Sequence, residues 1–490
     1  MTSVTTSAES SLPVHPSIEN LRNRAKQLHR LLVSGDSPTL ERLKAVKPNH
    51  PIEIKLADAQ YVLACELGFP SWVKLKSYVD SIQGANASRM RPFHTDSDYF
   101  DGRVDGLLSQ FASRLPAAAT QIRNSHPLFS ASADADIFDH EFTLDDARLV
   151  TAREHGFETW AKFKAHLRQL ADGSATEPFL LAFQAIEKHD IETLRKLLLG
   201  DGSLAQAAGT NGNSLLNLAG ACRFTAGSSL LISLGADVNR ANVRGWTPLH
   251  QAGYSNQAEL AKILLEAGAK PDGSAHGDGG TPLIAALFWG NRDVADLLAS
   301  YSLAPFNLRA AAGTGDMKLM RSLFDADGKL KAEAGAHRGF YRPHSGFPVW
   351  QPSDNPQEIL DEAFVYAAKS RRIEAMEFLL QQGANINGNP YRGTALTWVA
   401  AGSGDIGTAE WLINHGADVN QKATFGGPTH GEGITALHLA AQNGRLEFIK
   451  FLISRTADPS ITDDLYGGNG IGHANHWGHT QVVEYLRGLA

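Results

Sequence analysis

The stretch from Gly235 to Gly268 reads GADVNRANVRGWTPLHQAGYSNQAELAKILLEAG, and it holds start and stop signals for two helices. Thr247 can cap the free amides of a helix, and Pro248 suits its first position because its φ is preset. Ile263-Leu-Leu265 supplies an apolar stripe for a second helix. Gly268 ends that helix, since a left-handed C-cap favours a residue without a Cβ. The stretch therefore predicts a pair of helices followed by an extended turn.

The same signals return along the chain with a period of 33 residues. Helix-ending glycines or their stand-ins fall at Gly202, Gly235, Gly268 and Tyr301, and again at Gly383 and Gly416. The helix starts recur as Thr281-Pro-Leu-Ile284, Thr394-Ala-Leu-Thr397 and Thr435-Ala-Leu-His438, and the turns as Gly383-Ala-Asn-Ile-Asn387 and Gly416-Ala-Asp-Val-Asn420. A fixed period of this length is typical of a solenoid, in which stacked units share one continuous core.

Period, helix starts and helix stops together resemble the ankyrin-repeat family, in the form seen in bacterial ankyrin-repeat proteins, over residues 178–490. The resemblance implies an all-α fold, an ankyrin-repeat α-solenoid with finger loops, which we place at 176–490. About nine units are expected, with first helices near residues 179, 214, 247, 281, 308, 361, 394, 435 and 470.

A duplication precedes the repeats in the front third of the chain. LADAQYVLACELGFPSWVKLKSY begins at Leu56, and LDDARLVTAREHGFETWAKFKAH begins at Leu144. Each copy predicts a helix that ends at a glycine and a second helix with a Trp in its first turn. We therefore expect two related small helical modules at 17–82 and 104–172, after a flexible tail at 1–16 and separated by a linker at 83–103. The Phe and Trp of each copy are interpreted as joining its helices, with a ligand box as the alternative.

Two segments interrupt the period: an insertion at 328–357 and an expanded finger at 421–433. The insertion crowds His, Arg and aromatic residues into a short run that is punctuated by Gly and Pro, so it predicts no regular helix. One interpretation is a packed loop that covers the interruption. The other is a lid over the concave groove, because insertions in solenoids fall on one face, which is often the binding face.

The resemblance also implies which positions bind, since the family uses its fingers and the ends of its first helices. The finger positions are Arg244, Trp246, Asp278, Tyr391, Glu432 and Tyr466. The helix-end positions are Tyr254, Phe288, Trp289, Gln442, Asn443, His476 and Trp477. Aromatic residues are frequent in this set, and they dominate binding hot spots. We expect a shaped recognition groove.

Catalytic signals are weak, since no His-Glu-x-x-His, Gly-x-Ser-x-Gly, Walker or Cys-x-x-Cys motif occurs. If the lid closes a pocket, the candidates are His344 or His430 as proton carrier, Glu432 or Asp464 as carboxylate, and Tyr341. An anion would contact Arg338, Arg342 or Arg392. His473, His476 and His479 with His430 and Glu432 are a weaker metal alternative, because no spacing is diagnostic. We therefore predict no metal and no cofactor, and we interpret His250, His438 and His479 as structural.

Composition limits the class of protein. Hydrophobic residues make up 43% of the 490 residues, which excludes a disordered chain. The formal charge of −7 argues against nucleic acid or an anionic membrane as the main partner. The sequence shows neither a signal peptide nor an apolar run of the ~18 residues that a membrane span needs. Cys65 and Cys222 are too few for a disulfide scaffold, so we expect a cytoplasmic protein.

Two functional hypotheses follow. The first is a cytoplasmic recognition protein that binds a partner protein through its fingers and concave face. The alternative is a protein that binds a small polar or anionic molecule, or an acid/base enzyme, with its site under the 328–357 lid. Function does not follow from fold, so the sequence leaves both hypotheses open.

Overall fold

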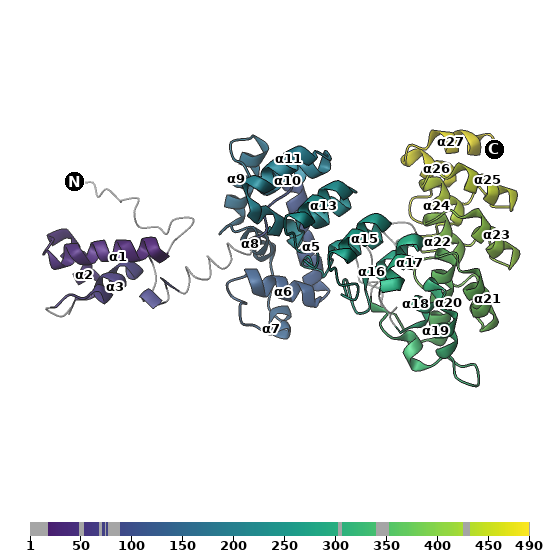
Figure 1. Cartoon of the computed structure of the whole chain (residues 1–490), viewed down its shortest axis with the longest axis horizontal. Helices are drawn as coiled ribbons and strands as arrows, with labels where there is room; N and C mark the ends of the chain where they lie inside the picture. Colours follow the sequence, from purple (N-terminus) through teal and green to yellow (C-terminus); the bar gives the residue numbers. More distant parts are fainter. Residues whose placement is uncertain are drawn as a thin grey trace.

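The fold was obtained as a computed structural model. It describes residues 18–48, 53–67, 71–73, 75–76, 89–301, 306–339, 352–424 and 432–489. Within these ranges the regular structure consists of helices and a few isolated β-bridges, with no strand, which confirms the all-α prediction. None of the helices in these ranges combines the length and the apolar character that crossing a bilayer requires. Figure 1 shows the helices arranged as an elongated array, with α1 to α3 at one end and the C-terminus at the other.

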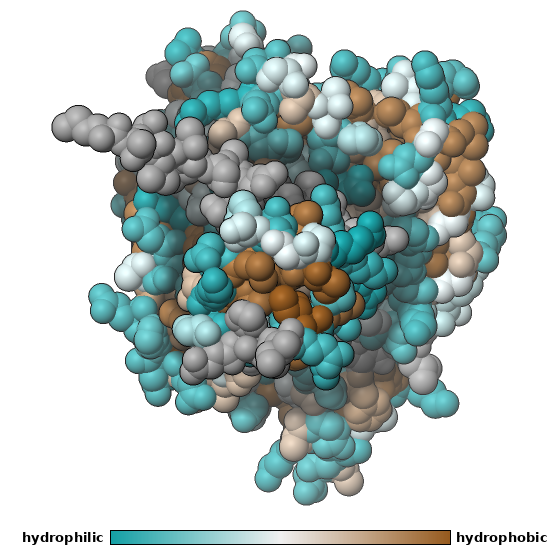
Figure 2. All heavy atoms as spheres, turned by 90° about the vertical axis from the view of Figure 1, so that its left-hand side faces the viewer, coloured by the Kyte–Doolittle hydropathy of each residue, from teal (hydrophilic) through white to brown (hydrophobic). Residues whose placement is uncertain are grey.

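In the described part of the first module, the helices with given bounds are α1 (Ile18–Val33), α2 (Ser37–Val46) and α3 (Leu56–Glu66). They enclose a small core of their own, which includes Leu21, Leu43 and Val62. Viewed from this end of the molecule, the surface is largely hydrophilic, and hydrophobic residues gather near its centre and along one edge (Figure 2).

The second module repeats this plan with five helices. These are α5 (Ser97–Ala112), α6 (Pro116–Ser125), α7 (Asp134–Phe138), α8 (Leu144–Glu154) and α9 (Trp160–Ala171). The duplicated aspartates make equivalent hydrogen bonds. Asp58 accepts a hydrogen bond from the Lys55 amide at 2.8 Å, and Asp146 accepts one from the Thr143 amide at 2.8 Å. Each closes a capping box at the start of its helix.

The Phe and Trp of the second copy join helices, as predicted. Phe157 and Trp160 both pack against Phe163 and lie beside the buried Ala152 of α8. The predicted linker, in contrast, is wrong for residues 89–103. Helix α5 already begins at Ser97, and the segment before it pairs with the solenoid.

Nine helix pairs follow in the described part of the solenoid, where the sequence predicts about nine units. The first helices are α10 (Pro178–Glu187), α12 (Leu215–Ala221), α14 (Pro248–Tyr254), α16 (Pro282–Trp289), α18 (Leu308–Thr314), α20 (Pro356–Lys369), α22 (Ala395–Ala401), α24 (Ala436–Gln442) and α26 (Gly470–His476). The second helices are α11 (Ile191–Gly200), α13 (Thr225–Ser233), α15 (Ala258–Glu266), α17 (Arg292–Tyr301), α19 (Met317–Ser322), α21 (Ile373–Gln381), α23 (Ile406–Asn414), α25 (Leu446–Ser454) and α27 (Thr480–Arg487). One continuous core runs through all nine pairs.

The repeated motifs link each unit to the next. His250 accepts hydrogen bonds from the amide and hydroxyl of Thr247 on Nδ1, and its Nε2 donates to the Gly280 carbonyl at 3.0 Å. Asn387 donates to the Gly416 carbonyl at 3.0 Å and accepts from the Asp418 amide at 2.8 Å. The motif residues therefore satisfy backbone groups across the interface between neighbouring repeats.

Helix α20 departs from this pattern where the insertion interrupts the array. It begins at Pro356, earlier than the predicted start near 361, because Asn355 caps an additional turn. In that turn Gln357 donates to the Gly383 carbonyl at 3.0 Å, and Asp361 accepts the Asn385 amide at 2.7 Å. Gln357 and Asp361 of the lengthened helix thus make the two contacts with the next repeat that Asn387 makes in a later unit.

Candidate binding surface

The second module is fixed to the solenoid by backbone pairing. Arg91 donates to the Ala208 carbonyl at 2.8 Å, and its own carbonyl accepts from Thr210 at 3.1 Å. His155, which is buried, donates to the Thr151 carbonyl at 2.8 Å through Nδ1, so its Nε2 accepts from the Thr210 hydroxyl at 3.1 Å. Burial lowers the pKa of His155 to about 4, which keeps the ring neutral. The module and the first repeats therefore share a rigid junction.

Two adjoining cavities lie at this junction. The finger groove has a volume of about 410 Å³ and is lined by Tyr99, Arg103, Asn211, Asn213, Asn242, Arg244, Trp246, Gln251, Tyr254 and His276. The junction cavity has a volume of about 530 Å³ and is lined by Arg89, Met90, Arg103, Gln110, Ala117, Thr120, Gln121, Asn124, Ser125, Arg153, Glu154, Val243 and Arg244. Both volumes lie in the range of ligand sites. Arg103 and Arg244 border both cavities.

Neighbouring fingers pair with each other along the groove. Val243 donates to the Asn211 carbonyl at 2.9 Å, and His276 donates to the Arg244 carbonyl at 3.2 Å. Asn242 donates to the Asn213 side chain at 3.0 Å. The fingers thus present their amide side chains from fixed positions.

Three aromatic residues that we expect to be exposed are buried, so this part of the prediction is wrong. Trp246, Phe288 and Tyr391 are 7%, 8% and 9% exposed. Trp246 donates to Gln251 at 3.1 Å and packs against His250 and His276.

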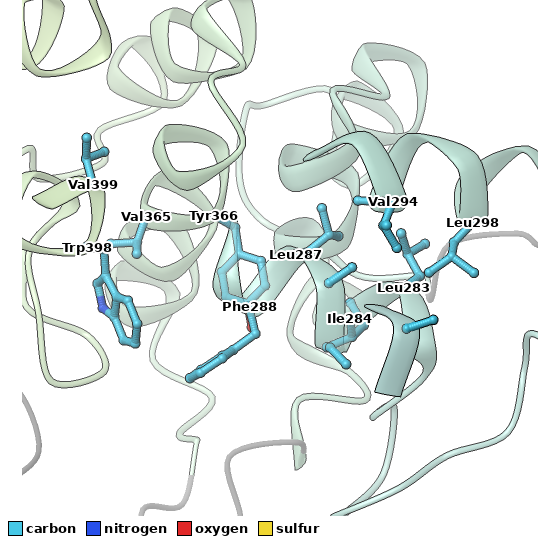
Figure 3. Close-up of a cluster of buried hydrophobic side chains, with 14 of the residues drawn as sticks. Leu283, Ile284, Leu287, Phe288, Val294, Leu298, Val365, Tyr366, Trp398 and Val399 are labelled. Carbon is cyan, nitrogen blue, oxygen red and sulfur yellow. The ribbon is translucent and has the colours of Figure 1, made fainter. Parts of the chain in front are cut away.

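The rings of Phe288, Tyr366 and Trp398 surround a buried lysine that sequence reasoning missed. The Nζ atom of Lys369 lies 3.8 Å from the ring centroid of Trp398 and 4.5 Å from that of Phe288. It also donates to the Phe288 carbonyl at 2.7 Å. Figure 3 shows Phe288, Tyr366 and Trp398 projecting into the same space from three helices. Burial lowers the pKa of Lys369 well below its ordinary value. The one sequence signal is a lysine in an otherwise apolar stretch of helix.

Arg338 is also engaged, so it does not serve as the predicted ligand for an anion. It is 3% exposed, donates to Glu362 through Nε and lies 2.6 Å from Glu358. Glu362 in turn accepts from Arg309 at 2.8 Å. This buried network fixes the start of the insertion to α20. The sequence gives no signal for it, because the partners are far apart in the chain.

Of the other predicted charged residues, Asp278, Glu432 and Asp464 are exposed and Arg392 is half-buried. Asp278 accepts from His337 Nδ1 at 2.8 Å, which holds this part of the insertion against a finger. Arg392 lies over the Tyr391 ring at 5.0 Å, and burial lowers its pKa. Asp464 forms an ion pair with Lys422, and its amide donates to the Glu432 carbonyl at 2.8 Å.

Of the other predicted aromatic residues, Trp289 is partly buried against the core, and three are exposed. Tyr254, Tyr466 and Trp477 are 42%, 78% and 56% exposed, and His476 is exposed beside Trp477. The Tyr254 ring meets the edge of Trp289 at 5.5 Å and that of Trp246 at 5.9 Å. Tyr254 is therefore both presented to solvent and held in place.

Four predicted site residues, Tyr341, Arg342, His344 and His430, lie outside the described residues. Within the described ranges, no group of three or more His, Cys, Asp or Glu side chains is arranged to hold a metal ion. His473 instead lies 3.2 Å from Asp463 Oδ2, and His479 Nε2 donates to the Gln442 carbonyl at 3.0 Å.

Fold and surface define a helical repeat solenoid with a groove along its fingers. Family models described as ankyrin repeats match residues 182–275, 229–310 and 351–423, and also 396–453 and 437–487. These matches cover more than half of the chain, which therefore belongs to the ankyrin-repeat family. Ankyrin repeats generally mediate protein–protein interaction.

The individual proteins that the chain resembles share low sequence identity with it. The chain is 27% identical over 243 residues to the Caenorhabditis elegans ankyrin repeat and KH domain-containing protein mask-1, which covers 48% of this chain and 8% of that protein. It is 24% identical to human Rabankyrin-5 over 62% of this chain and 27% of that protein. The human ASB11 ankyrin repeat domain matches with 20% identity and a TM-score of 0.29, over 57% of this chain and 98% of that chain. The chain thus spans less than a third of the length of these two curated relatives.

Proposed function

We propose that this protein is a cytoplasmic recognition protein that binds a segment of a partner protein in the finger groove and along the concave face. The observation that carries the proposal is the groove itself, in which the half-exposed Tyr254 stands beside a row of finger asparagines. Tyrosine supplies large contact area at low entropic cost, and asparagine supplies adaptable hydrogen bonds. The free thiols of Cys65 and Cys222 agree with a reducing compartment.

Asn211 strengthens the proposal. Its side-chain oxygen is buried and accepts no hydrogen bond from the residues that the structure describes. Its backbone is left-handed, with a φ of 65°, and its carbonyl accepts from the Val243 amide of the next finger at 2.9 Å. An unpartnered buried acceptor costs free energy, and a peptide amide in the groove would satisfy it once the Asn211 side chain turns towards the groove that it lines. The groove therefore suits an extended segment with free backbone amides.

Tyr254→Ala tests the proposal, and Tyr301→Ala is the matched control. Tyr301 is 51% exposed at the end of α17 and does not line the groove. Peptides selected from a random display library on the unmodified protein should lose about tenfold or more in affinity for Tyr254→Ala, as for an aromatic hot spot. They should bind Tyr301→Ala unchanged. Equal binding to all three proteins would exclude the groove as the binding site.

The alternative, a small-molecule or acid/base site under the 328–357 lid, has less support. Arg338, the one anion-binding candidate of that segment within the described ranges, is already paired with two carboxylates. We therefore favour partner binding.

A further inference from the structure

The junction cavity carries an unusual balance of charge. Four arginines line it, Arg89, Arg103, Arg153 and Arg244, together with a single acidic residue, Glu154. Burial raises the pKa of Glu154 to about 7, so near neutral pH this carboxyl is charged only part of the time. The lining therefore has an excess of three to four positive charges.

Three of these arginines form no ion pair within the described ranges, although the Arg103 guanidinium lies near enough to Glu154 to lower the pKa of that carboxyl. Arg89 lies 3.9 Å from Glu177, whose other oxygen lies 3.7 Å from Arg91. Arg103, Arg153 and Arg244 form no ion pair and no side-chain hydrogen bond with any residue in the ranges that the structure describes. Burial and the nearby Arg103 guanidinium both lower the pKa of Arg244. The two guanidinium groups thus repel each other across the cavity.

The arginines are also fixed relative to one another. They come from four separate places: the segment before α5, helix α5, the end of α8, and a finger of the solenoid. Met90 donates to the Glu154 carbonyl at 2.8 Å, so the first of these segments is bound to α8. The Arg91 and His155 contacts then bind both to the solenoid. A site with fixed cations needs little reorganisation when it binds an anion.

Hydroxyl and amide groups complete the lining. Thr120, Gln121, Asn124 and Ser125 face the cavity from α6. Guanidinium groups bind phosphate bidentately, and neutral donors of this kind occupy the remaining phosphate oxygens. A volume of about 530 Å³ exceeds what a single inorganic ion needs, so the cavity accommodates a larger molecule.

We propose that the junction cavity binds a small polyanion that carries two or more phosphate groups. Its negative charges would compensate the unpaired arginines, and it would contact the second module and the solenoid at once. A free small molecule fits better than a nucleic acid, because the net charge of −7 opposes a long polyanion, while the cavity provides a local positive site. This site is separate from peptide binding in the finger groove, although Arg103 and Arg244 border both.

Thermal unfolding of the full chain with added pyrophosphate tests the proposal, with sodium chloride at equal ionic strength as the reference. Pyrophosphate should raise the melting temperature in a saturable manner, because a ligand of the native state stabilises it. ATP in a parallel series should act similarly if the site accepts nucleotides as well as free polyphosphate. An equal effect of citrate would overturn the preference for phosphate.

Three variants make the result specific. Arg153→Gln and Arg244→Gln should weaken pyrophosphate binding at least tenfold in calorimetric titration, while Arg195→Gln, at an exposed position on α11, should not. Without ligand, Arg244→Gln should melt at the same or a higher temperature than the unmodified chain, because it removes a repelling cation. A pyrophosphate shift that equals the sodium chloride shift, or one that survives both cavity variants, would overturn the proposal. Display peptides test the finger groove separately, so the two proposals fail independently.

Discussion

Replacing Glu362 with glutamine tests whether the buried ion network stabilises the middle of the solenoid. The Glu362 side chain is 1% exposed, and its two oxygens accept from different arginines, Arg309 on α18 and Arg338 within the insertion. The side chains of these arginines are 1% and 2% exposed. Glutamine keeps the volume of the side chain and removes its charge, so the variant leaves two cations buried with one carboxylate fewer.

The expected loss follows from the burial of the pair. Removing one partner of a buried ion pair costs about 3–5 kcal/mol, because the remaining charge stays desolvated. Arg338 retains Glu358 at 2.6 Å, which places the loss near the lower end, at about 3 kcal/mol. Glu374→Gln is the matched control on the next helix. That side chain is 73% exposed and lies 4.0 Å from Arg321, so the loss should stay below about 1 kcal/mol.

Urea denaturation of the full chain measures the change, and hydrogen exchange followed by mass spectrometry locates it. A solenoid can open in sections, so exchange should accelerate in α18 and α20 more than in α10 or α26. Glu374→Gln should leave both measurements close to those of the unmodified chain. If Glu362→Gln denatures within about 0.5 kcal/mol of that control, the network contributes no net stability and the reasoning fails.

Three further predictions concern the repeat motif, the junction and pH. Asn387→Ala removes two hydrogen bonds between repeats and should lower the free energy of unfolding by about 1–2 kcal/mol, whereas Asn475→Ala, which removes none, should not. Gly209→Ala would place a Cβ 2.6 Å from Phe179 and 2.9 Å from Phe93, so it should cost about 1–3 kcal/mol and accelerate amide exchange at Thr210. Gly102→Ala meets no atom within 4 Å and should be neutral or slightly stabilising. Burial holds the pKa of His155, His250 and His438 at about 4, below the 6.5 of an unfolded chain, so each costs about 2 kcal/mol of stability as pH falls from 7 to 5. Glu154 acts in the opposite direction, since its pKa of about 7 lies above 4.5 and the native state takes up the proton first. Glu154→Gln should therefore make the acid loss steeper by about 2 kcal/mol, and an unchanged pH profile would contradict this assignment.

The fold was largely predictable because its signals are local. A threonine cap at Thr247 and a left-handed glycine at Gly268, with a φ of 90°, act within one helical turn, so they can be read directly from the sequence. The start of α20 was predicted five residues too late for the same reason. The period predicts a helix start only where the shared motif occurs. Asn355, whose side chain caps the extended helix, lies in the inserted segment, so the period does not predict it.

The candidate site was predictable only in part, because its residues depend on contacts between distant segments. Arg244 and Tyr254 were found from their place in the repeat, but Arg103 and Glu154 line the same cavities from outside the repeats. Trp246 occupies a position that the family leaves exposed, and here His276 of the next finger helps to bury it. A repeat pattern predicts the backbone position of a residue. It does not predict whether a side chain of the next repeat buries that residue.

Net charge is also a poor guide to the charge of an individual cavity in this chain. The whole chain has 45 Lys and Arg against 52 Asp and Glu, whereas the junction cavity is lined by four arginines and one glutamate. Screening limits the reach of exposed charges to about 8–10 Å at physiological salt, so an anion in the cavity responds to its lining more than to the total. The negative net charge of the chain opposes the approach of large polyanions. The positive charge of the cavity lining determines how small anions bind there. Ionic strength should therefore weaken pyrophosphate binding by Arg153 and Arg244 only moderately, since partly buried charges are screened less than exposed ones.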